Sequence, residues 1–196
     1  MPTPSFLSRP HLVARVLAAR ADWLLVTGLG TATYDVAACG DDPLNFYLWG
    51  AMGGAAMTGL GLALAQPGRR VVVLTGDGEA LMGLGALATI AVQDPPNLGL
   101  IVLDNARYGE TGGQASHTGR GVDLAAIARG AGFRNVHTLH DEETLTNFLA
   151  GLGTAPAWPF FARAVVRDEE KERRLPPRDG AFLANRFRSA LGLPPS

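Results

Sequence analysis

The stretch VVVLTGDGEALMGLGALATIAVQDPPNLGLIVLDN, residues 71–105, contains the pattern that decides the fold. An apolar run of strand length ends in Gly76-Asp77-Gly78, a longer apolar stretch follows, and a second strand-like run ends in Asn105. This order is typical of a βαβ unit, in which the two strands are parallel and lie in one sheet. We therefore expect Asp77 and Asn105 at the tips of neighbouring strands.

The same alternation of short apolar runs and longer helical patterns extends over most of the 196 residues. The strand runs are almost continuously apolar, as expected when helices cover both faces of a sheet. We predict an α/β fold, a three-layer α/β/α domain with a mainly parallel central sheet. Strands are expected at residues 23–27, 71–75, 98–104, 135–139 and 160–166. Helices are expected at residues 10–20, 52–65, 79–93, 124–131, 142–152 and 180–191.

The chain length suits one well-buried domain, which we assign to residues 1–166. Residues 167–196 begin with the charge run RDEEKERRLPPRD and form a separate segment, a charged linker followed by a C-terminal helix. This segment could be a solvated linker or an arm that contacts a partner chain. The sequence supports the two interpretations about equally.

Composition excludes several classes of function. The net charge is −1 and the charges are interspersed, so no basic stripe indicates nucleic acid or a membrane surface. Residues 49–65 carry no charge but are rich in Gly and Ala, which favours a packed interior helix over a membrane span. Cys39 is the only cysteine, so no internal disulfide can form, and a cytoplasmic location is expected.

Several strand ends in the expected sheet are rich in Gly or polar residues, and ligands of open α/β sheets bind at this edge. Asp77 and Asn105 offer one carboxylate and one carboxamide, a set that suits Mg²⁺ when phosphate and water complete its shell. Gly76 and Gly78 allow the main chain to approach a ligand closely. The pattern therefore indicates a site for Mg²⁺ and a phosphate-bearing cofactor.

These residues resemble the binding motif of thiamine diphosphate (ThDP) enzymes, in which GDG is followed after a helix and a strand by Asn. The segments NFYLWGAMG (residues 45–53) and YGETGGQ (residues 108–114) widen the resemblance. Residues from about 24 to 135 are similar to the β subunit of sulfopyruvate decarboxylase and to the C-terminal part of phosphonopyruvate decarboxylase. The resemblance implies the diphosphate-binding domain of a ThDP-dependent decarboxylase.

The resemblance also implies roles for individual residues. The Mg²⁺ ligands would be the side chains of Asp77 and Asn105 and the backbone carbonyl of Arg107. Gly50 would offer its carbonyl to the aminopyrimidine, and Met52 would be the apolar wedge that bends the cofactor. The residues implied in cofactor binding are Gly50, Met52, Gly76, Asp77, Gly78, Glu79, Asn105, Tyr108 and Gly109.

Two positions depart from the pattern of these relatives, and one histidine is ambiguous. Glu79 and Glu110 stand where Ser is common, and a carboxylate beside a diphosphate is unfavourable without compensation. His117 follows the second segment and is the candidate catalytic acid or base. A surface histidine in a loop is an equally good interpretation.

The family activates ThDP with a glutamate from a separate pyrimidine-binding domain, for which this chain has no room. The resemblance therefore implies a hetero-oligomer, α2β2 or larger, with a separate pyrimidine-binding subunit. The leading hypothesis is the ThDP- and Mg²⁺-binding subunit of a non-oxidative 2-oxo acid decarboxylase acting on a sulfopyruvate- or phosphonopyruvate-like substrate. The alternatives are a subunit of a carboligase of the acetolactate synthase type and a cofactor-binding module without catalysis.

Overall fold

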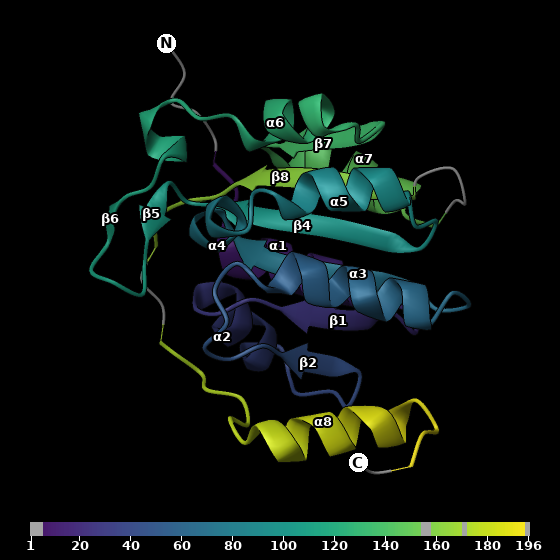
Figure 1. Ribbon diagram of the computed structural model, residues 1–196. Coiled ribbons are helices and arrows are strands. Elements are labelled where there is room, and N and C mark those ends of the chain that lie inside the picture. The colour runs from purple at the N-terminus through teal and green to yellow at the C-terminus, as the bar shows by residue number, and fades with distance from the viewer. Residues whose placement is uncertain (1–5, 154–157, 170–171, 195–196) are drawn as a thin grey trace.

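A computed structural model describes residues 6–153, 158–169 and 172–194. Its centre is a six-stranded sheet in the order β2-β1-β3-β4-β8-β7, in which every neighbouring pair is parallel (Figure 1). The predicted α/β fold with a mainly parallel sheet is confirmed. The strands are β1 (Leu24–Thr27), β2 (Asn45–Tyr47), β3 (Val71–Gly76), β4 (Leu98–Asp104), β7 (Asn135–Leu139) and β8 (Phe160–Val165).

Helices cover both faces of this sheet. One layer contains α1 (Arg9–Ala18), α2 (Thr31–Ala38) and α7 (Glu142–Gly151), and the other contains α3 (Ala55–Ala65), α5 (Ala86–Gln93) and α6 (Leu124–Ala131). Figure 1 shows α3 and α5 in front of the sheet. The chain therefore has the predicted three layers.

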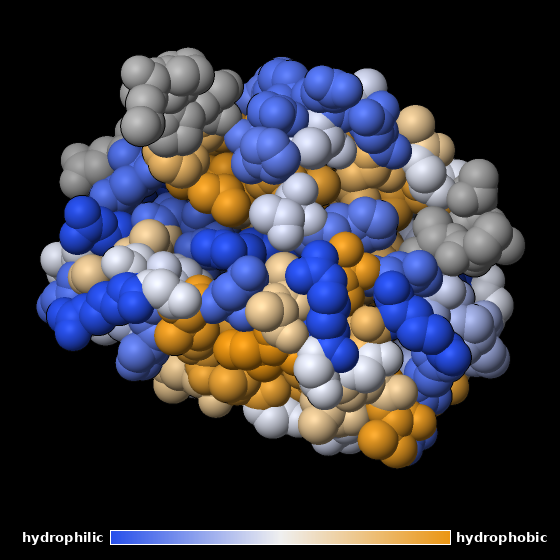
Figure 2. All heavy atoms as spheres, turned by 90° about the horizontal axis from the view of Figure 1, so that it is seen from above, coloured by the Kyte–Doolittle hydropathy of each residue, from blue (hydrophilic) through white to orange (hydrophobic). Residues whose placement is uncertain are grey.

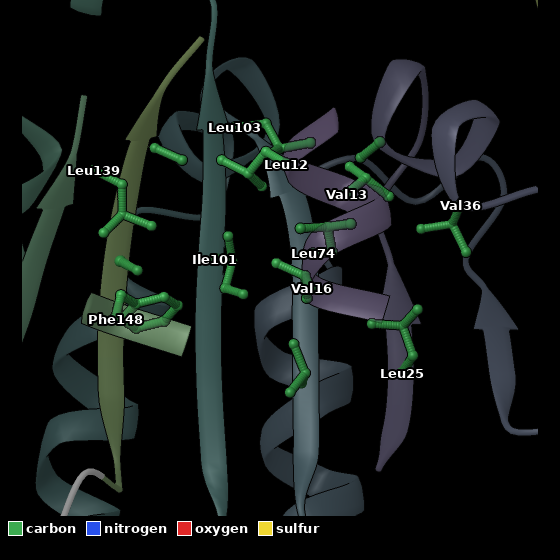
Figure 3. Packing of buried hydrophobic residues seen from close by; sticks show 14 of the residues in the cluster. Leu12, Val13, Val16, Leu25, Val36, Leu74, Ile101, Leu103, Leu139 and Phe148 are labelled. Carbon is green, nitrogen blue, oxygen red and sulfur yellow. The ribbon is translucent and has the colours of Figure 1, made fainter. Parts of the chain in front are cut away.

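Alternate strand residues bury their side chains in the two opposite layers. Leu74 and Ile101 belong to the core on the side of α1, whereas Val73 and Leu100 belong to the core on the side of α3. Figure 3 shows the first core, in which Leu12, Val13 and Val16 of α1 pack on the middle strands. Burial on both faces explains the continuous apolar runs of the sequence.

The carboxyl ends of the strands carry the short elements α4 (Asp77–Met82), β5 (Arg107–Tyr108), β6 (Gln114–Ala115) and η1 (Thr118–Arg120). The strands β5 and β6 form a small antiparallel hairpin outside the main sheet, at the left of Figure 1. This edge of the sheet therefore holds most of the irregular backbone between β3 and α6.

The structure corrects two predicted helices. The helix expected at 79–93 is divided into α4 and α5, because Gly83 crosses close to the backbone of Gly53. The helix expected at 52–65 begins only at Ala55, since Gly50 and Gly53 have φ angles of 71° and 87°. Positive φ angles interrupt a right-handed helix.

The sequence interpretation also missed two elements, α2 and β2. The strand β2 lies inside the segment 45–53 that had been assigned to cofactor binding. The helical spacing of Met57 and Met82 predicts core positions, but both are exposed, at 42% and 63%. Their helices bury the opposite side, so helical spacing alone predicts the wrong face for these two residues.

The C-terminal helix α8 (Gly180–Ala190) packs against the β2 edge of the sheet in its own chain (Figure 1). The Phe187 ring lies edge-on to Phe46 at 5.6 Å, and Arg186 donates to the backbone carbonyl of Asn45 at 3.0 Å. The linker before it is held by Trp49, whose indole donates to the Pro177 carbonyl at 3.1 Å. Part of the charge run, residues 170–171, lies outside the described residues.

The surface around β7, α6 and α7 is viewed in Figure 2, where polar side chains are interrupted by small apolar patches. Cys39 is exposed and has no disulfide. None of the described helices is long and apolar enough to span a membrane.

Candidate cofactor site

A cleft at the carboxyl edge of the sheet brings together most of the predicted site residues. Neighbouring strands β3 and β4 pair Gly76 with Leu103, so the residues that follow both strands share one side of the cleft, as the βαβ pattern predicted. The loop after β1 and the segment before α3 complete its wall. Predicted residues that line the cleft are Met52, Gly76, Asp77, Gly78, Glu79, Asn105, Arg107, Tyr108 and Gly109.

Gly50 and His117 do not line the cleft in this structure. His117 is exposed and its Nδ1 lies 2.9 Å from the hydroxyl of Tyr108, whose ring stands between the histidine and Gly78. A Cβ on Gly78 would lie 2.7 Å from that ring, so the glycine allows Tyr108 to close over the start of α4. His117 reaches the site only through Tyr108, which favours the interpretation as a surface histidine.

Asp77 is buried at 1% exposure and is held by two hydroxyl groups. Ser116 donates to its Oδ2 at 2.5 Å, and the Thr118 hydroxyl lies 3.0 Å from the same oxygen. Burial raises the pKa of Asp77, the Asp104 carboxylate raises it further, and the hydroxyl groups oppose both. Because both hydroxyls reach Oδ2, neither of them occupies Oδ1.

A second carboxylate, Asp104, supports this arrangement from the end of β4. The Thr118 hydroxyl lies 2.7 Å from its Oδ1, and Arg163 on the adjacent β8 donates to its Oδ2 at 2.6 Å. The Thr118 hydroxyl has a single hydrogen to donate. Because Ser116 already donates to Asp77, Thr118 is able to donate to Asp104. The sequence interpretation missed Asp104, Ser116, Thr118 and Arg163, because they are brought to Asp77 only by the sheet order and the η1 turn.

The loop after β4 turns sharply immediately behind Asn105. Ala106 has a φ angle of 60°, and its carbonyl accepts a hydrogen bond from the Ser116 amide at 2.9 Å. The Asn105 side-chain oxygen accepts from the Arg107 amide at 3.1 Å. This left-handed residue reverses the chain between Asn105 and Arg107, so both lie on the cleft.

Glu79 is the residue whose placement differs most from the expectation. Its carboxyl points into the protein, where Oε1 accepts from the Ala55 amide at 3.2 Å and Oε2 from the Thr75 hydroxyl at 2.9 Å. Burial raises the pKa of Glu79 although these bonds oppose the shift. The repulsion expected between this side chain and a diphosphate is therefore reduced by its orientation.

Larger hollows exist elsewhere on the molecule. One of about 530 Å³ adjoins the cleft and shares Thr31, Asn105, Arg107 and Gly109 with it. Two others, of about 320 Å³ and 440 Å³, lie near β7 and contain none of the predicted site residues. The cleft is distinguished by its chemistry rather than its size, because it joins a buried carboxylate, a carboxamide and glycine backbone.

Comparison with known proteins identifies the family of this chain. Residues 28–154 match the family described as thiamine pyrophosphate enzyme, C-terminal TPP binding domain. The chain belongs to this family. Thiamine pyrophosphate is another name for ThDP, so the cofactor of this ThDP-binding chain is established at the level of the family.

Several relatives of the ThDP-binding chain are named decarboxylases. It is 38% identical over 181 residues to sulfopyruvate decarboxylase subunit beta of Methanothermobacter thermautotrophicus, and the match covers 92% of this chain and 94% of the relative. It is 45% identical over 160 residues to phosphonopyruvate decarboxylase of Streptomyces hygroscopicus, which covers 82% of this chain but only 36% of that protein. The chain therefore corresponds in extent to a beta subunit and to part of the larger enzyme.

Solved structures agree on the fold of the ThDP-binding chain. A ThDP-dependent 4-hydroxybenzoylformate decarboxylase from Rhodococcus jostii aligns with a TM-score of 0.69 and 23% identity, over 87% of this chain and 34% of that one. A putative thiamin diphosphate-dependent enzyme from Mycobacterium smegmatis aligns with the same TM-score over 83% of this chain and 32% of that one. At this identity the likeness concerns the fold alone.

The residues of the cleft suit ThDP and Mg²⁺. Mg²⁺ prefers oxygen ligands and usually combines few protein ligands with phosphate and water. Asp77 and Asn105 supply such oxygens, and no group of three or more His, Cys, Asp or Glu side chains in the described part of the chain could hold a metal alone. A metal here is therefore expected to depend on the diphosphate for further ligands.

Proposed function

We propose that this chain is the ThDP- and Mg²⁺-binding subunit of a hetero-oligomeric, non-oxidative 2-oxo acid decarboxylase. The observation that supports this most directly is the match to nearly the full length of sulfopyruvate decarboxylase beta subunits, combined with Asp77 and Asn105 on one cleft. The proposed substrates are 3-sulfopyruvate-like or 3-phosphonopyruvate-like acids, and the proposed location is cytoplasmic.

In this function, bound ThDP supplies a nucleophilic carbon and an electron sink for the loss of CO₂. The chain's own residues bind and orient the cofactor. The Asp77 and Asn105 side chains and the Arg107 carbonyl are the proposed metal ligands, and Gly76 and Gly78 bring backbone to the diphosphate. The Gly50 carbonyl and the Met52 side chain would orient the aminopyrimidine.

The proposed enzyme also needs a separate pyrimidine-binding subunit, in an α2β2 or larger assembly. Relatives named subunit beta support a partner, since that name implies a second kind of chain. We assign residues 1–166 to cofactor binding. The charge run 167–179 is a candidate partner contact, whereas α8 is occupied by its own chain.

CO₂ release tests this proposal. We expect the chain co-purified with its partner to release CO₂ and free aldehyde from sulfopyruvate or phosphonopyruvate in a reaction that needs Mg²⁺ and ThDP, whereas the chain alone releases none. A complex that holds ThDP and converts none of the tested acids would contradict the decarboxylase assignment. A 2-hydroxy ketone product would favour the carboligase alternative, to which an acetolactate synthase from Oryza sativa gives weaker support at 30% identity over 151 residues.

Exposed apolar side chains on α3 and α4 offer a second test. Met57 and Leu64 of α3 and Met82 of α4 are exposed, and no charged residue occurs between Ala80 and Gln93. We expect Met82→Glu to weaken association with the partner at least 10-fold, because a buried carboxylate without a counter-charge is unfavourable in an interface. Affinity is measured by surface plasmon resonance.

The matched control is Asn147→Glu, which adds the same charge to an exposed position of α7 on the other layer. It should leave association unchanged. Equal affinities of the two variants would place the partner away from α4.

A further inference from the structure

Glu79 has a set of contacts that neither the metal site nor the core explains. Glu79 is 4% exposed, and its carboxyl accepts hydrogen bonds from the Ala55 amide at 3.2 Å and from the Thr75 hydroxyl at 2.9 Å. The backbone amides of Leu29 and Gly53 also face this carboxyl. The three amides belong to two separate segments of the chain.

These two segments form part of the wall of the cleft. Leu29 lies in the loop between β1 and α2, which lines the cleft together with Gly30 and Thr31. Gly53 and Ala55 lie at the start of α3, directly after Met52, which also lines the cleft. One side chain on α4 therefore ties the loop after β1 to the segment that carries Gly50 and Met52.

The backbone around the Glu79 carboxyl also leaves room for it. A Cβ on Gly28 would lie 1.6 Å from Glu79 Oε2, so the absence of a side chain at Gly28 makes room for the carboxyl. Glu79 forms no ion pair within the described ranges 6–153, 158–169 and 172–194. A buried carboxyl without a cation is a poor source of stability, so its ordered contacts point to a role in placing these segments.

We propose that Glu79 is a positioning residue, which fixes the loop after β1 and the Gly50–Gly54 segment against each other so that Gly50 and Met52 are correctly placed for the aminopyrimidine of ThDP. The proposal rests on the proposed function for the roles of Gly50 and Met52. It assigns two tasks to residues of α4 that are two positions apart: Asp77 is the proposed metal ligand, and Glu79 holds the opposite wall of the cleft.

Hydrogen exchange tests the contact itself. Glu79→Gln keeps the size of the side chain but presents an NH₂ group to amides that need an acceptor. In the isolated chain we expect faster exchange at the amides of Leu29, Gly53 and Ala55, measured by NMR, while amides of β4 stay protected. Unchanged exchange at the three amides would overturn the proposal, and this readout does not depend on catalysis.

Cofactor binding and turnover test the functional part. In the assembled enzyme we expect Glu79→Gln to lower kcat by about 100-fold, as a small misplacement of reacting groups does. ThDP affinity in the presence of Mg²⁺, measured by calorimetry, should fall less than 5-fold, and the near-ultraviolet circular dichroism of the bound cofactor should change. Glu143→Gln, on the exposed side of α7, is the control and should match the wild type.

Two further outcomes separate this proposal from its alternatives. If the role of Glu79 is purely structural, the Glu79→Gln variant should show faster hydrogen exchange at all amides. Its activity should then fall only in proportion to the unfolded fraction, which thermal unfolding measures. That result would overturn the positioning role. A wild-type complex with the partner that holds ThDP without decarboxylation would end the proposed function. Altered circular dichroism of ThDP bound to Glu79→Gln would still support positioning, and an unaltered spectrum would oppose it.

Discussion

Replacing Asp77 with asparagine is expected to remove Mg²⁺-dependent ThDP binding while leaving the fold as stable as the wild type or more stable. The carboxylate is lost as a metal ligand, and a neutral amide binds Mg²⁺ far more weakly. We expect the affinity measured by calorimetry with Mg²⁺ to fall by at least about 100-fold, which corresponds to about 2.7 kcal/mol.

The stability half of this prediction follows from the raised pKa of Asp77. An acid whose pKa is higher in the folded state destabilises the fold as the pH rises from its unfolded pKa through its folded pKa. At neutral pH the asparagine variant avoids that penalty and the repulsion from Asp104. Thermal unfolding of the free chain at pH 7 checks this, and a clear fall in Tm would show that the charge of Asp77 stabilises the fold.

Asp123→Asn is the matched control for the metal assignment. Asp123 caps α6 by accepting from the Ala125 amide at 2.9 Å, and an asparagine oxygen is also a good cap. Asp123 does not line the cleft, and an asparagine oxygen can keep its 3.4 Å contact with Arg163, so ThDP affinity should be unchanged. If both variants bind ThDP equally well, Asp77 is not a metal ligand.

Gly83→Ala is expected to have a large effect on stability. A Cβ on Gly83 would lie 2.3 Å from the Gly53 carbonyl oxygen and 3.1 Å from its Cα. Both are backbone atoms, so no change of rotamer relieves the clash. We expect a loss of about 1–3 kcal/mol in the free energy of unfolding, with weaker ThDP binding because Gly53 follows Met52 directly.

Gly85→Ala provides a close control two residues further on. No atom lies within 4 Å of a Cβ built on Gly85, and its φ angle of −62° suits alanine. Urea denaturation of both variants measures the difference. Equal free energies of unfolding would mean that the α3 and α4 segments separate easily at this crossing.

The sequence allowed a good prediction of the sheet, because the long apolar runs such as 98–104 reflect burial on both faces. The sequence order of Asp77 and Asn105 also predicted their shared edge, since parallel neighbours end together. The missed elements have weak local signals: β2 is three residues long, and α2 follows Gly30 without a capping side chain. Short elements of this kind are specified by tertiary packing rather than by local pattern.

The surroundings of the site residues were less predictable than the residues themselves. Nothing local to Glu79 indicates that its carboxyl turns toward amides more than 20 residues away in sequence, at Ala55 and Leu29. The contacts of Asp104 with Arg163 likewise require β8 to lie beside β4. Such partners depend on strand order, which local sequence patterns do not specify.

The strand order has a consequence for how this chain is made. β8 is the last of the described strands to be synthesised, yet it lies between β4 and β7. Until residue 165 is available, β4 has one unpaired edge, and β7 has no neighbour in the sheet. Because β4 is buried along its whole length in the finished domain, that open edge would be an apolar template for other chains. The period between synthesis of β4 and of β8 is therefore when the nascent chain is most exposed to aggregation and depends most on chaperones.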